Sequence, residues 1–258
     1  MNAMNPKHSF LSRRTLGIAA IGAAATLLLA SCGGGGNSAD TSTPSDYNTK
    51  DPGTVQLQVT HRVAITVSMP DLSAIVAPAT PATLDQAGYN ALPTVTKTIN
   101  IGLDHRHAPI STDNFLGYLN SGAYANTIFH RVIAGFVAQG GGYTVATDGT
   151  LTHIATNAAI TLESRNGLAN TRGTLAMART TDANSATSEF YFNLVNNVGP
   201  APFLVNLDYQ SADAPGYAVF GTVMDQASLD VMDAIAKIRT DSSDRPLGNV
   251  TITSITVK

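Results

Sequence analysis

The sequence predicts a mainly β protein in which short strands close into a barrel and two α-helices cap its ends. Apolar residues alternate with polar ones in several separate segments, as in strands that bury one face. Two further segments carry apolar residues at helical spacing. The roughly 200 residues that follow an N-terminal leader suit a single domain with a sizeable core.

The first 31 residues are predicted to be a cleaved export signal. Lys7, Arg13 and Arg14 form a basic start, and an apolar run extends from Leu16 to Ala30. This run is shorter than the ~20 residues that a membrane-spanning helix needs, so a signal peptide is the better interpretation. Residues 12–16 resemble a twin-arginine export signal. An ordinary basic start with two adjacent arginines is the alternative.

A lipid anchor is predicted at Cys32. Residues 29–32, Leu-Ala-Ser-Cys, resemble a bacterial lipobox, in which cleavage precedes the cysteine and a lipid is attached to its sulfur. Gly33 follows rather than an aspartate that would favour the inner membrane, so we expect the outer membrane, facing the periplasm. Cys32 is the only cysteine, which excludes an intramolecular disulfide and a cysteine zinc cluster.

A flexible tether is predicted for residues 32–53, because Gly, Ser, Thr, Asp, Asn and Pro dominate there. The domain is then expected to occupy residues 54–258. Without the leader the chain has twelve basic and eighteen acidic residues, a formal charge of about −6. An acidic domain without a basic stripe argues against nucleic-acid binding. We expect a monomer.

The first strands of the domain are predicted from apolar residues at every second position, at 55–59, 63–69 and 99–103. Between the last two lies the segment from Pro70 to Pro93, which is rich in Ala, Pro and Thr. We interpret it as an insertion in the connection of the first two barrel strands. A surface decoration is the favoured role, and a partner-binding arm is the alternative.

A first helix is predicted after Pro109. Ser111 or Thr112 is the expected N-terminal cap, and Gly122 is expected to end the helix. The apolar stripe on this helix consists of Phe115, Leu116 and Leu119.

A second helix and a last strand are predicted near the C-terminus. The helix runs from Ser228 to Ile238, and the strand from Val250 to Val257. In the strand the apolar alternation changes parity between Ile252 and Ile255, which indicates a β-bulge. The helix carries its apolar side at Val231, Met232, Ile235 and Ile238.

The stretch of residues 128–142 contains the first candidate for chemistry. Phe129, Arg131 and Ile133 alternate with other residues and are expected on one strand face, with His130 on the other. An arginine among apolar groups is unusual in a core, because a buried guanidinium needs partners. The alternative is an edge arginine whose stem covers apolar surface while its head stays in water.

This stretch resembles the signature of the cyclophilins, the cyclosporin-binding family of peptidyl-prolyl isomerases. Two more blocks, residues 170–192 and 216–223, resemble the family in the same order. The resemblance covers roughly residues 97–258 and is closest to bacterial periplasmic members. It implies an eight-stranded antiparallel barrel with a helix over each opening. It also implies isomerisation of X-Pro bonds in proline-containing segments of exported proteins, without a metal or cofactor.

The resemblance also assigns site residues. Arg131 matches the arginine that draws the prolyl nitrogen lone pair out of conjugation, Gln139 the glutamine that orients it, and His130 a pocket residue. The residues expected around the substrate are Phe136, Val137, Ala178, Glu189, Tyr191, Phe203, Leu204 and Tyr217. For each aromatic residue, ordinary core packing is the alternative.

The chain departs from the family pattern in several places. Phe203 stands where tryptophan is frequent, Tyr217 where histidine is frequent, and Tyr191 where phenylalanine is expected. Glu189 replaces a glutamine, and a carboxylate only accepts hydrogen bonds. Glu189 is expected either to repel a substrate carbonyl or to pair with Arg131 and hold it back. A catalytically weak module that binds proline-containing chains or an envelope partner is therefore the alternative to an isomerase.

Overall fold

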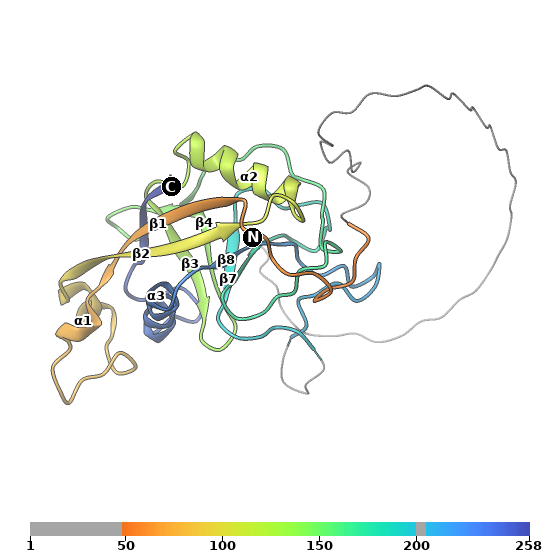
Figure 1. The fold of residues 1–258 in the computed structure, drawn as a ribbon. Coiled ribbons are helices and arrows are strands. Elements are labelled where there is room, and N and C mark those ends of the chain that lie inside the picture. The colour runs from red at the N-terminus through yellow and green to blue at the C-terminus, as the bar shows by residue number, and fades with distance from the viewer. Residues whose placement is uncertain (1–47, 200–204) are drawn as a thin grey trace, which may run out of the picture. The chain divides into compact units, whose positions relative to one another are not determined.

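The computed structural model describes residues 48–199 and 205–258, in which one antiparallel β-sheet dominates (Figure 1). The strands are β1 (His61–Pro70), β2 (Thr94–Leu103), β3 (Thr127–Ile133), β4 (Val137–Val145), β5 (Leu151–His153), β6 (Thr174–Met177), β7 (Phe190–Asn193), β8 (Val219–Val223) and β9 (Thr251–Val257). The helices are α1 (Gln86–Ala91), α2 (Pro109–Asn120) and α3 (Gln226–Lys237), with a short 3₁₀-helix at Leu72–Ala74.

The sheet closes into a barrel. Its strand order is β3-β9-β1-β2-β8-β6-β7-β4-β5, and β3 also pairs with β4. Eight strands therefore form the closed antiparallel barrel, and β5 is added outside the closure as a partner of β4. Closure removes the free strand edges that an open sheet would expose. The predicted mainly β, eight-stranded barrel is confirmed.

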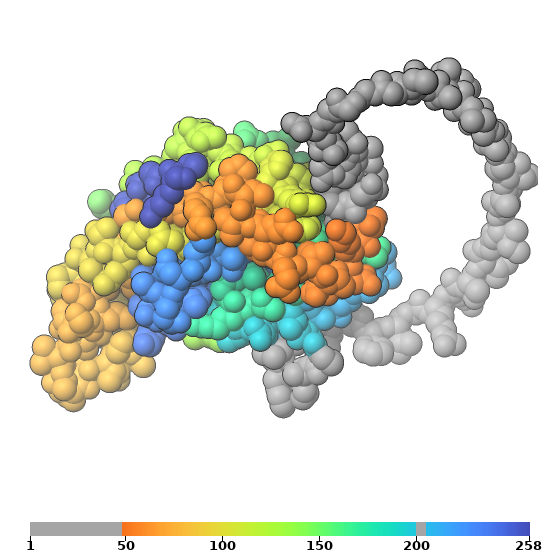
Figure 2. All heavy atoms as spheres, viewed as in Figure 1, coloured from red at the N-terminus to blue at the C-terminus, as the bar shows by residue number. Residues whose placement is uncertain are grey.

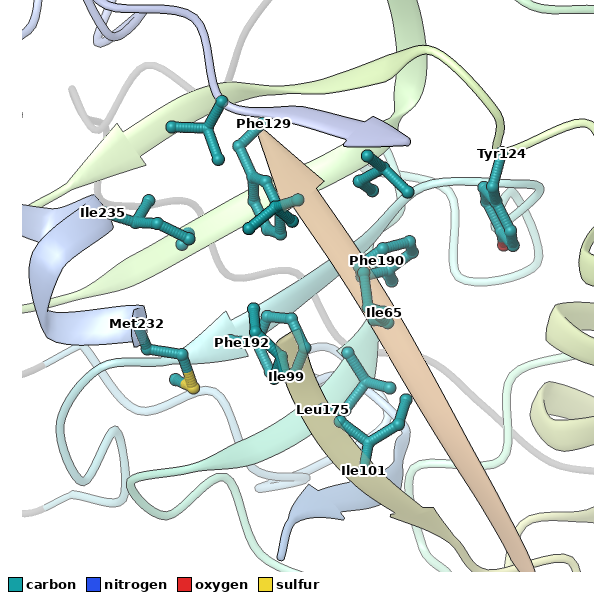
Figure 3. Close-up of a cluster of buried hydrophobic side chains, with 14 of the residues drawn as sticks. Ile65, Ile99, Ile101, Tyr124, Phe129, Leu175, Phe190, Phe192, Met232 and Ile235 are labelled. Atoms are coloured by element: carbon teal, nitrogen blue, oxygen red, sulfur yellow. The ribbon is translucent and has the colours of Figure 1, made fainter. Parts of the chain in front are cut away.

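The barrel interior holds the main hydrophobic core (Figure 3). The aromatic rings make edge-to-face contacts, such as that of Phe115 with Phe190 at 5.4 Å between ring centroids. The helices α2 and α3 lie on different sides of the strands (Figure 1), and each contributes apolar residues to this core. Labelled members in Figure 3 are Ile65, Ile99, Ile101, Tyr124, Phe129, Leu175, Phe190, Phe192, Met232 and Ile235.

The predicted C-terminal elements are confirmed. Helix α3 begins at Gln226, two residues earlier than predicted, because Asp225 caps it by accepting a hydrogen bond from the Ser228 N–H at 2.8 Å. The bulge in β9 is also present. Thr66 faces Ser254 while Val67 faces Ile252, so the intervening residue of β9 has no partner on β1.

The predicted capping of α2 is wrong. The helix begins at Pro109, so Ser111 lies inside its first turn and Ala108 provides no side-chain cap. The Ile110 and Ser111 N–H groups instead donate to the Glu163 carboxylate at 3.2 and 2.6 Å. Glu163 is fully buried, and burial raises its pKa to about 7 despite these hydrogen bonds. A residue distant in sequence therefore serves as the cap.

The apolar stripe of α2 also differs from the prediction. Phe115 is fully buried as expected, but Leu116 and Leu119 are only partly buried. Tyr118 takes the second core position. At the end of the helix, Gly122 adopts a φ of +74° and donates its N–H to the Leu119 carbonyl. The prediction that Gly122 ends this helix is confirmed.

Residues 55–59, predicted as a strand, form none. Their backbone partners lie on different segments: Val55 donates to the Gly167 carbonyl at 3.2 Å, and Gln58 donates to the Asp104 carboxylate at 2.7 Å. No continuous ladder forms from such scattered partners. The apolar alternation has a different cause, because Val55 and Leu57 pack against an apolar cluster outside the barrel.

Residues 48–53, expected as the end of the tether, are hydrogen-bonded to the domain. Asn48 donates its side-chain amide to the Leu162 carbonyl at 3.0 Å, and Lys50 donates its N–H to the Arg165 carbonyl at 2.7 Å. The expected signal peptide, Cys32 and the rest of the tether lie outside the described residues. Within the described ranges, no helix is long and apolar enough to cross a bilayer.

The segment from Pro70 to Pro93 was interpreted as an insertion. Pro70 is the last residue of β1, and residues 71–93 connect β1 and β2, which pair from His61–Leu103 to Pro70–Thr94. It protrudes from the barrel at one end (Figure 2) and contains α1. Tyr89 anchors it: the buried hydroxyl donates to the Pro81 carbonyl at 2.6 Å and accepts from the Arg239 N–H at 2.9 Å.

The Glu163 cap predicts a pH-dependent stability. The carboxyl group has an ordinary pKa of 4.5 in the unfolded chain and about 7 when folded, so the folded state binds the extra proton between these values. The contribution of Glu163 to the free energy of unfolding is then full below pH 4.5 and is lost as the pH rises through 7. Relative to Glu163→Gln, the wild type is expected to lose on the order of 2–3 kcal/mol of unfolding free energy between pH 4.5 and pH 8.

Urea denaturation of both proteins at several pH values measures this difference. The variant retains an acceptor for the Ser111 N–H, so the comparison isolates the ionisation of residue 163 from the loss of the cap. Parallel stability profiles for the two proteins would contradict the assignment.

Candidate functional site

A β-bulge at His130 directs Arg131 out of the barrel. Phe129 pairs with Gly140 and Arg131 pairs with Gln139, so two steps on β3 match a single step on β4. Phe129 is buried in the core while the Arg131 side chain is 21% exposed. The expectation that these two residues share a strand face is therefore wrong, because it assumed an unbroken alternation.

Arg131 belongs to a row of residues that crosses four adjacent strands. It pairs with Gln139 on β4, Gln139 pairs with Tyr191 on β7, and Tyr191 pairs with Ala176 on β6. Paired residues of neighbouring strands lie on the same face of a sheet. The barrel thus brings together side chains that are up to sixty residues apart in the chain.

An apolar cluster continues this row on the outer face of the barrel, separate from the main core. We call it the outer apolar cluster. Of the residues predicted around the substrate, it contains Phe136, Val137, Ala178, Tyr191 and Tyr217. Its other members are Val55, Leu57, Leu168, Ala176, Leu207 and Val219. The predicted residues Phe203 and Leu204 lie outside the described residues.

Sequence patterns did not identify Leu168 and Leu207 as neighbours of this surface. Both residues lie in segments without regular secondary structure, where apolar periodicity gives no signal. Their burial depends on loop hydrogen bonds, such as that from the Leu207 N–H to the Asn197 carbonyl at 2.8 Å.

The Tyr191 hydroxyl points into the protein. It donates to the Asn170 side-chain oxygen at 2.8 Å, and Asn193 donates to the same oxygen at 3.1 Å. Asn170 in turn donates to the Asp208 carboxylate at 2.9 Å. Burial raises the pKa of Tyr191 well above its ordinary value, so the phenol remains a neutral donor. The extra hydroxyl therefore stabilises the floor of the cluster.

Tyr217 forms one edge of the cluster. Its ring is 5.8 Å from the Tyr191 ring at an interplanar angle of 82°, and the Arg179 guanidinium lies over it at 4.5 Å. Arg179 is held there because it donates two hydrogen bonds to the Gly216 carbonyl. Burial raises the pKa of Tyr217, while the charges of Arg179 and Arg131 lower it. Arg131 is thus within electrostatic reach of this ring.

The expectation that Glu189 pairs with Arg131 is wrong, because neither residue has the other among its ion-pair partners. Its carboxylate accepts a hydrogen bond from the Gln139 side-chain amide at 2.7 Å. His130 Nε2 lies 3.2 Å from the same oxygen, and His153 Nε2 lies 3.5 Å from the other. Gly142 leaves room for the carboxylate, because a Cβ at that position would lie 2.6 Å from Glu189 atoms.

These partners keep Glu189 ionised. Burial alone would raise its pKa, but the hydrogen bond and charge of His130, the Gln139 hydrogen bond and the charge of His153 together hold the pKa below its ordinary value. A carboxylate only accepts, so Gln139 must turn its NH₂ group toward it. The orientation of the Gln139 amide is therefore fixed by Glu189.

Two residues of this arrangement, Tyr143 and His153, were not predicted. They pair across β4 and β5, and the Tyr143 ring lies between His130 and His153 at centroid distances of 4.7 and 4.8 Å. No spacing rule in the sequence links His153 to His130, because the hairpin of β4 and β5 brings them together. Among the described residues, no group of three His, Cys, Asp or Glu side chains is arranged to hold a metal ion.

The Arg131 guanidinium has one ion pair within the described part of the chain. Its Nε lies 3.5 Å from the Asp244 carboxylate, on the loop between α3 and β9. Within the described residues, no group forms a hydrogen bond with the terminal NH₂ groups of Arg131. The site therefore combines a charged donor fork and an oriented amide with an adjacent apolar cluster, an arrangement suited to holding an apolar ring next to a polar amide.

The chain is similar to a known family over most of this domain. Residues 91–257 match the family model described as "Cyclophilin type peptidyl-prolyl cis-trans isomerase/CLD". A peptidyl-prolyl cis-trans isomerase B of Escherichia coli strain K12 is 46% identical over 154 residues, which cover 58% of this chain and 87% of the relative. A peptidyl-prolyl cis-trans isomerase A of Dickeya dadantii strain 3937 is 42% identical over 151 residues, 58% of this chain and 72% of the relative.

The fold also resembles a solved structure. A crystal structure of a cyclophilin-type peptidyl-prolyl cis-trans isomerase of Cryptosporidium parvum aligns with a TM-score of 0.51 and 22% identity. The alignment covers 77% of this chain and 97% of that one.

Proposed function

The chain belongs to the cyclophilin-type peptidyl-prolyl cis-trans isomerases and isomerises X-Pro peptide bonds; from this premise we propose where its active site lies and on which proteins it acts. Arg131, Gln139 and the outer apolar cluster form the active site. The observation that carries this proposal is the in-register row from Arg131 through Gln139 to Tyr191, next to that cluster. The substrates are proline-containing segments of unfolded exported proteins in the bacterial cell envelope.

The chemistry requires no nucleophile or metal. Rotation about a prolyl amide is opposed by the partial double-bond character of the C–N bond, with a barrier near ~20 kcal/mol. A donor close to the prolyl nitrogen draws its lone pair out of conjugation. The terminal NH₂ groups of Arg131 are such donors, and the guanidinium that carries them is permanently charged. They lower the barrier only as far as they bind the twisted amide more tightly than the planar one.

The outer apolar cluster provides the complementary surface for the proline ring. Phe136 and Tyr217 are partly buried members that remain partly accessible, whereas Val137, at the start of β4, is buried. A pyrrolidine ring that packs there loses contact with water, which strengthens electrostatic interactions of the neighbouring amide with Arg131. Tyr191 supports this surface from below through its hydroxyl bond to Asn170.

Gln139 and His130 act beside the arginine. The Gln139 NH₂ is directed at Glu189, so its carbonyl oxygen remains to accept a hydrogen bond from a substrate N–H or from Arg131. His130 Nε2 lies 3.2 Å from the Glu189 carboxylate, while the buried Nδ1 has no hydrogen-bond partner among the described residues. The Nε2–H is therefore the ring group that donates to Glu189. His130 thus orients Glu189, and through it Gln139.

The envelope location rests on sequence features. A basic start, an apolar run of fifteen residues and the lipobox-like residues 29–32 precede the domain. Slow X-Pro isomerisation limits the folding of many proteins, which gives an isomerase a role where exported chains fold. We place the protein on the outer membrane, facing the periplasm, with a lipid on Cys32.

Replacement of Arg131 tests the active site. In the full-length protein purified in detergent, Arg131→Ala is expected to lower kcat/KM for a short Ala-Pro peptide at least 100-fold, about 2.7 kcal/mol of barrier. The control is Arg62→Ala, which removes an exposed arginine from β1. Wild-type activity in Arg131→Ala would show that the active site lies elsewhere.

Replacement of Glu189 tests whether its charge limits turnover. Glu189→Gln is expected to raise kcat/KM several-fold, because a glutamine still accepts from Gln139 and also donates to a substrate carbonyl, a hydrogen bond of about 1 kcal/mol. Glu189→Ala supplies neither group and serves as the control. Unchanged or lower turnover in a folded Glu189→Gln protein would show that the carboxylate does not hinder catalysis.

Replacement of Cys32 tests the anchor. The wild type expressed in a Gram-negative host is expected to incorporate labelled palmitate and to sediment with outer membranes. Cys32→Ser is expected to lose the label, because the chain has no other cysteine to carry a thioether lipid. Label retained in the variant would contradict lipid attachment at Cys32.

A further inference from the structure

The loop between α3 and β9, residues 240–246, is closed by its own hydrogen bonds. Its two ends pair at Thr240 and Pro246, and Asp241 donates its N–H to the Arg245 carbonyl at 2.9 Å. The Asp241 carboxylate accepts from the N–H groups of Ser243 and Arg245 at 2.8 and 3.0 Å. These bonds define one conformation for the residue at the tip, Asp244.

Asp244 attaches this loop to β3 at two consecutive residues. Its carbonyl accepts from the Val132 N–H at 2.8 Å, and its carboxylate lies 3.5 Å from the Arg131 Nε. Its backbone is left-handed, with a φ of +63°, which aspartate tolerates better than most residues. Non-glycine residues with such torsions gather at functional sites. The backbone bond sets the loop against β3, and the carboxylate then reaches the arginine.

The 240–246 loop is also held from outside. Arg245 donates to the Gly149 carbonyl, beyond the end of β4, at 2.9 Å. On the other flank, Gln86 of α1 donates to the Leu247 carbonyl. A cavity of about 280 Å³ lies between these elements, with Asp241 and Arg245 among its lining residues. The position of the loop therefore depends more on hydrogen bonds than on close packing.

We propose that Asp244 is a positioning residue for Arg131. It holds the Nε so that the two terminal NH₂ groups of the guanidinium extend toward the prolyl amide. It does not contact the substrate. An arginine side chain has many rotamers, and an anchor at Nε reduces the conformational freedom that substrate binding must otherwise remove. This inference rests on the proposed role of Arg131.

The test compares full-length wild type, Asp244→Asn and Asp233→Asn. Asparagine keeps the shape of aspartate and tolerates a positive φ, so the loop is retained while the charge is lost. The control, Asp233→Asn, removes the carboxylate that pairs with Arg172 at 2.9 Å. The Asp233 side chain is 39% exposed, against 44% for Asp244, and neither Asp233 nor Arg172 belongs to the outer apolar cluster. Asp244→Asn is expected to lower kcat/KM for an Ala-Pro peptide three- to tenfold, with Asp233→Asn within twofold of wild type.

A double-mutant cycle with Arg131→Ala separates positioning from general destabilisation. If Asp244 acts through Arg131, then Asp244→Asn has no further effect on kcat/KM in the Arg131→Ala protein. The Arg131 Nε–H resonance provides a second readout, because it should exchange faster with water in Asp244→Asn. Asp244→Gly, which accepts the positive φ without strain, should reproduce both effects.

The outcomes distinguish this inference from the proposed function. Loss of activity in Arg131→Ala with wild-type activity in Asp244→Asn would overturn the positioning role and leave the active site in place. An equal loss from Asp244→Asn with and without Arg131 would also overturn it, because the effect would then not pass through the arginine. Wild-type activity in Arg131→Ala would overturn the proposed active site itself.

Discussion

The pairing of β3 with β4, which closes the barrel, is the constraint on which the site depends. Because β4 also pairs with β7 and β5, its register fixes residues on three neighbouring strands. The pairing of β3 with β4 contains two register shifts, and the one at His130 directly precedes Arg131. It allows Phe129 to fill the core and Arg131, two residues later, to face outward beside Gln139. The single unpaired residue, His130, thus allows one strand to contribute both a core side chain and an outward-facing cation.

Glu189 shows how an ionised group is accommodated in a largely buried position. Desolvation of a carboxylate is unfavourable unless hydrogen bonds and opposite charges compensate for it. Here Gln139, His130 and His153 supply the partners, and Gly142 supplies the space. The same bonds fix the Gln139 amide, so the charge determines which hydrogen bonds this side chain can offer. The carboxylate is consequently part of the architecture of the site.

Elements with strong periodicity were predictable from the sequence, whereas contacts between distant segments were not. The apolar side of α3 and the bulge in β9 follow from local spacing and were predicted. The bulge at His130 leaves no comparable signal, because the apolar pattern around it fits a regular strand as well. The Glu163 cap of α2 and the partner of Arg131, Asp244, lie far from these residues in sequence. Only the closed barrel brings them together.

The segment of residues 71–93 lies almost entirely before the part of the chain that matches the family, yet it contacts the flanks of the loop that reaches Arg131. The Tyr89 hydroxyl accepts from Arg239 at one end of that loop, and Gln86 donates to Leu247 at the other. A surface decoration without structural consequence would not bury a tyrosine at this junction. Hydrogen bonds at both flanks restrict the motion of a loop that borders a cavity. The segment is therefore hydrogen-bonded to both flanks of the loop whose Asp244 carboxylate lies beside Arg131.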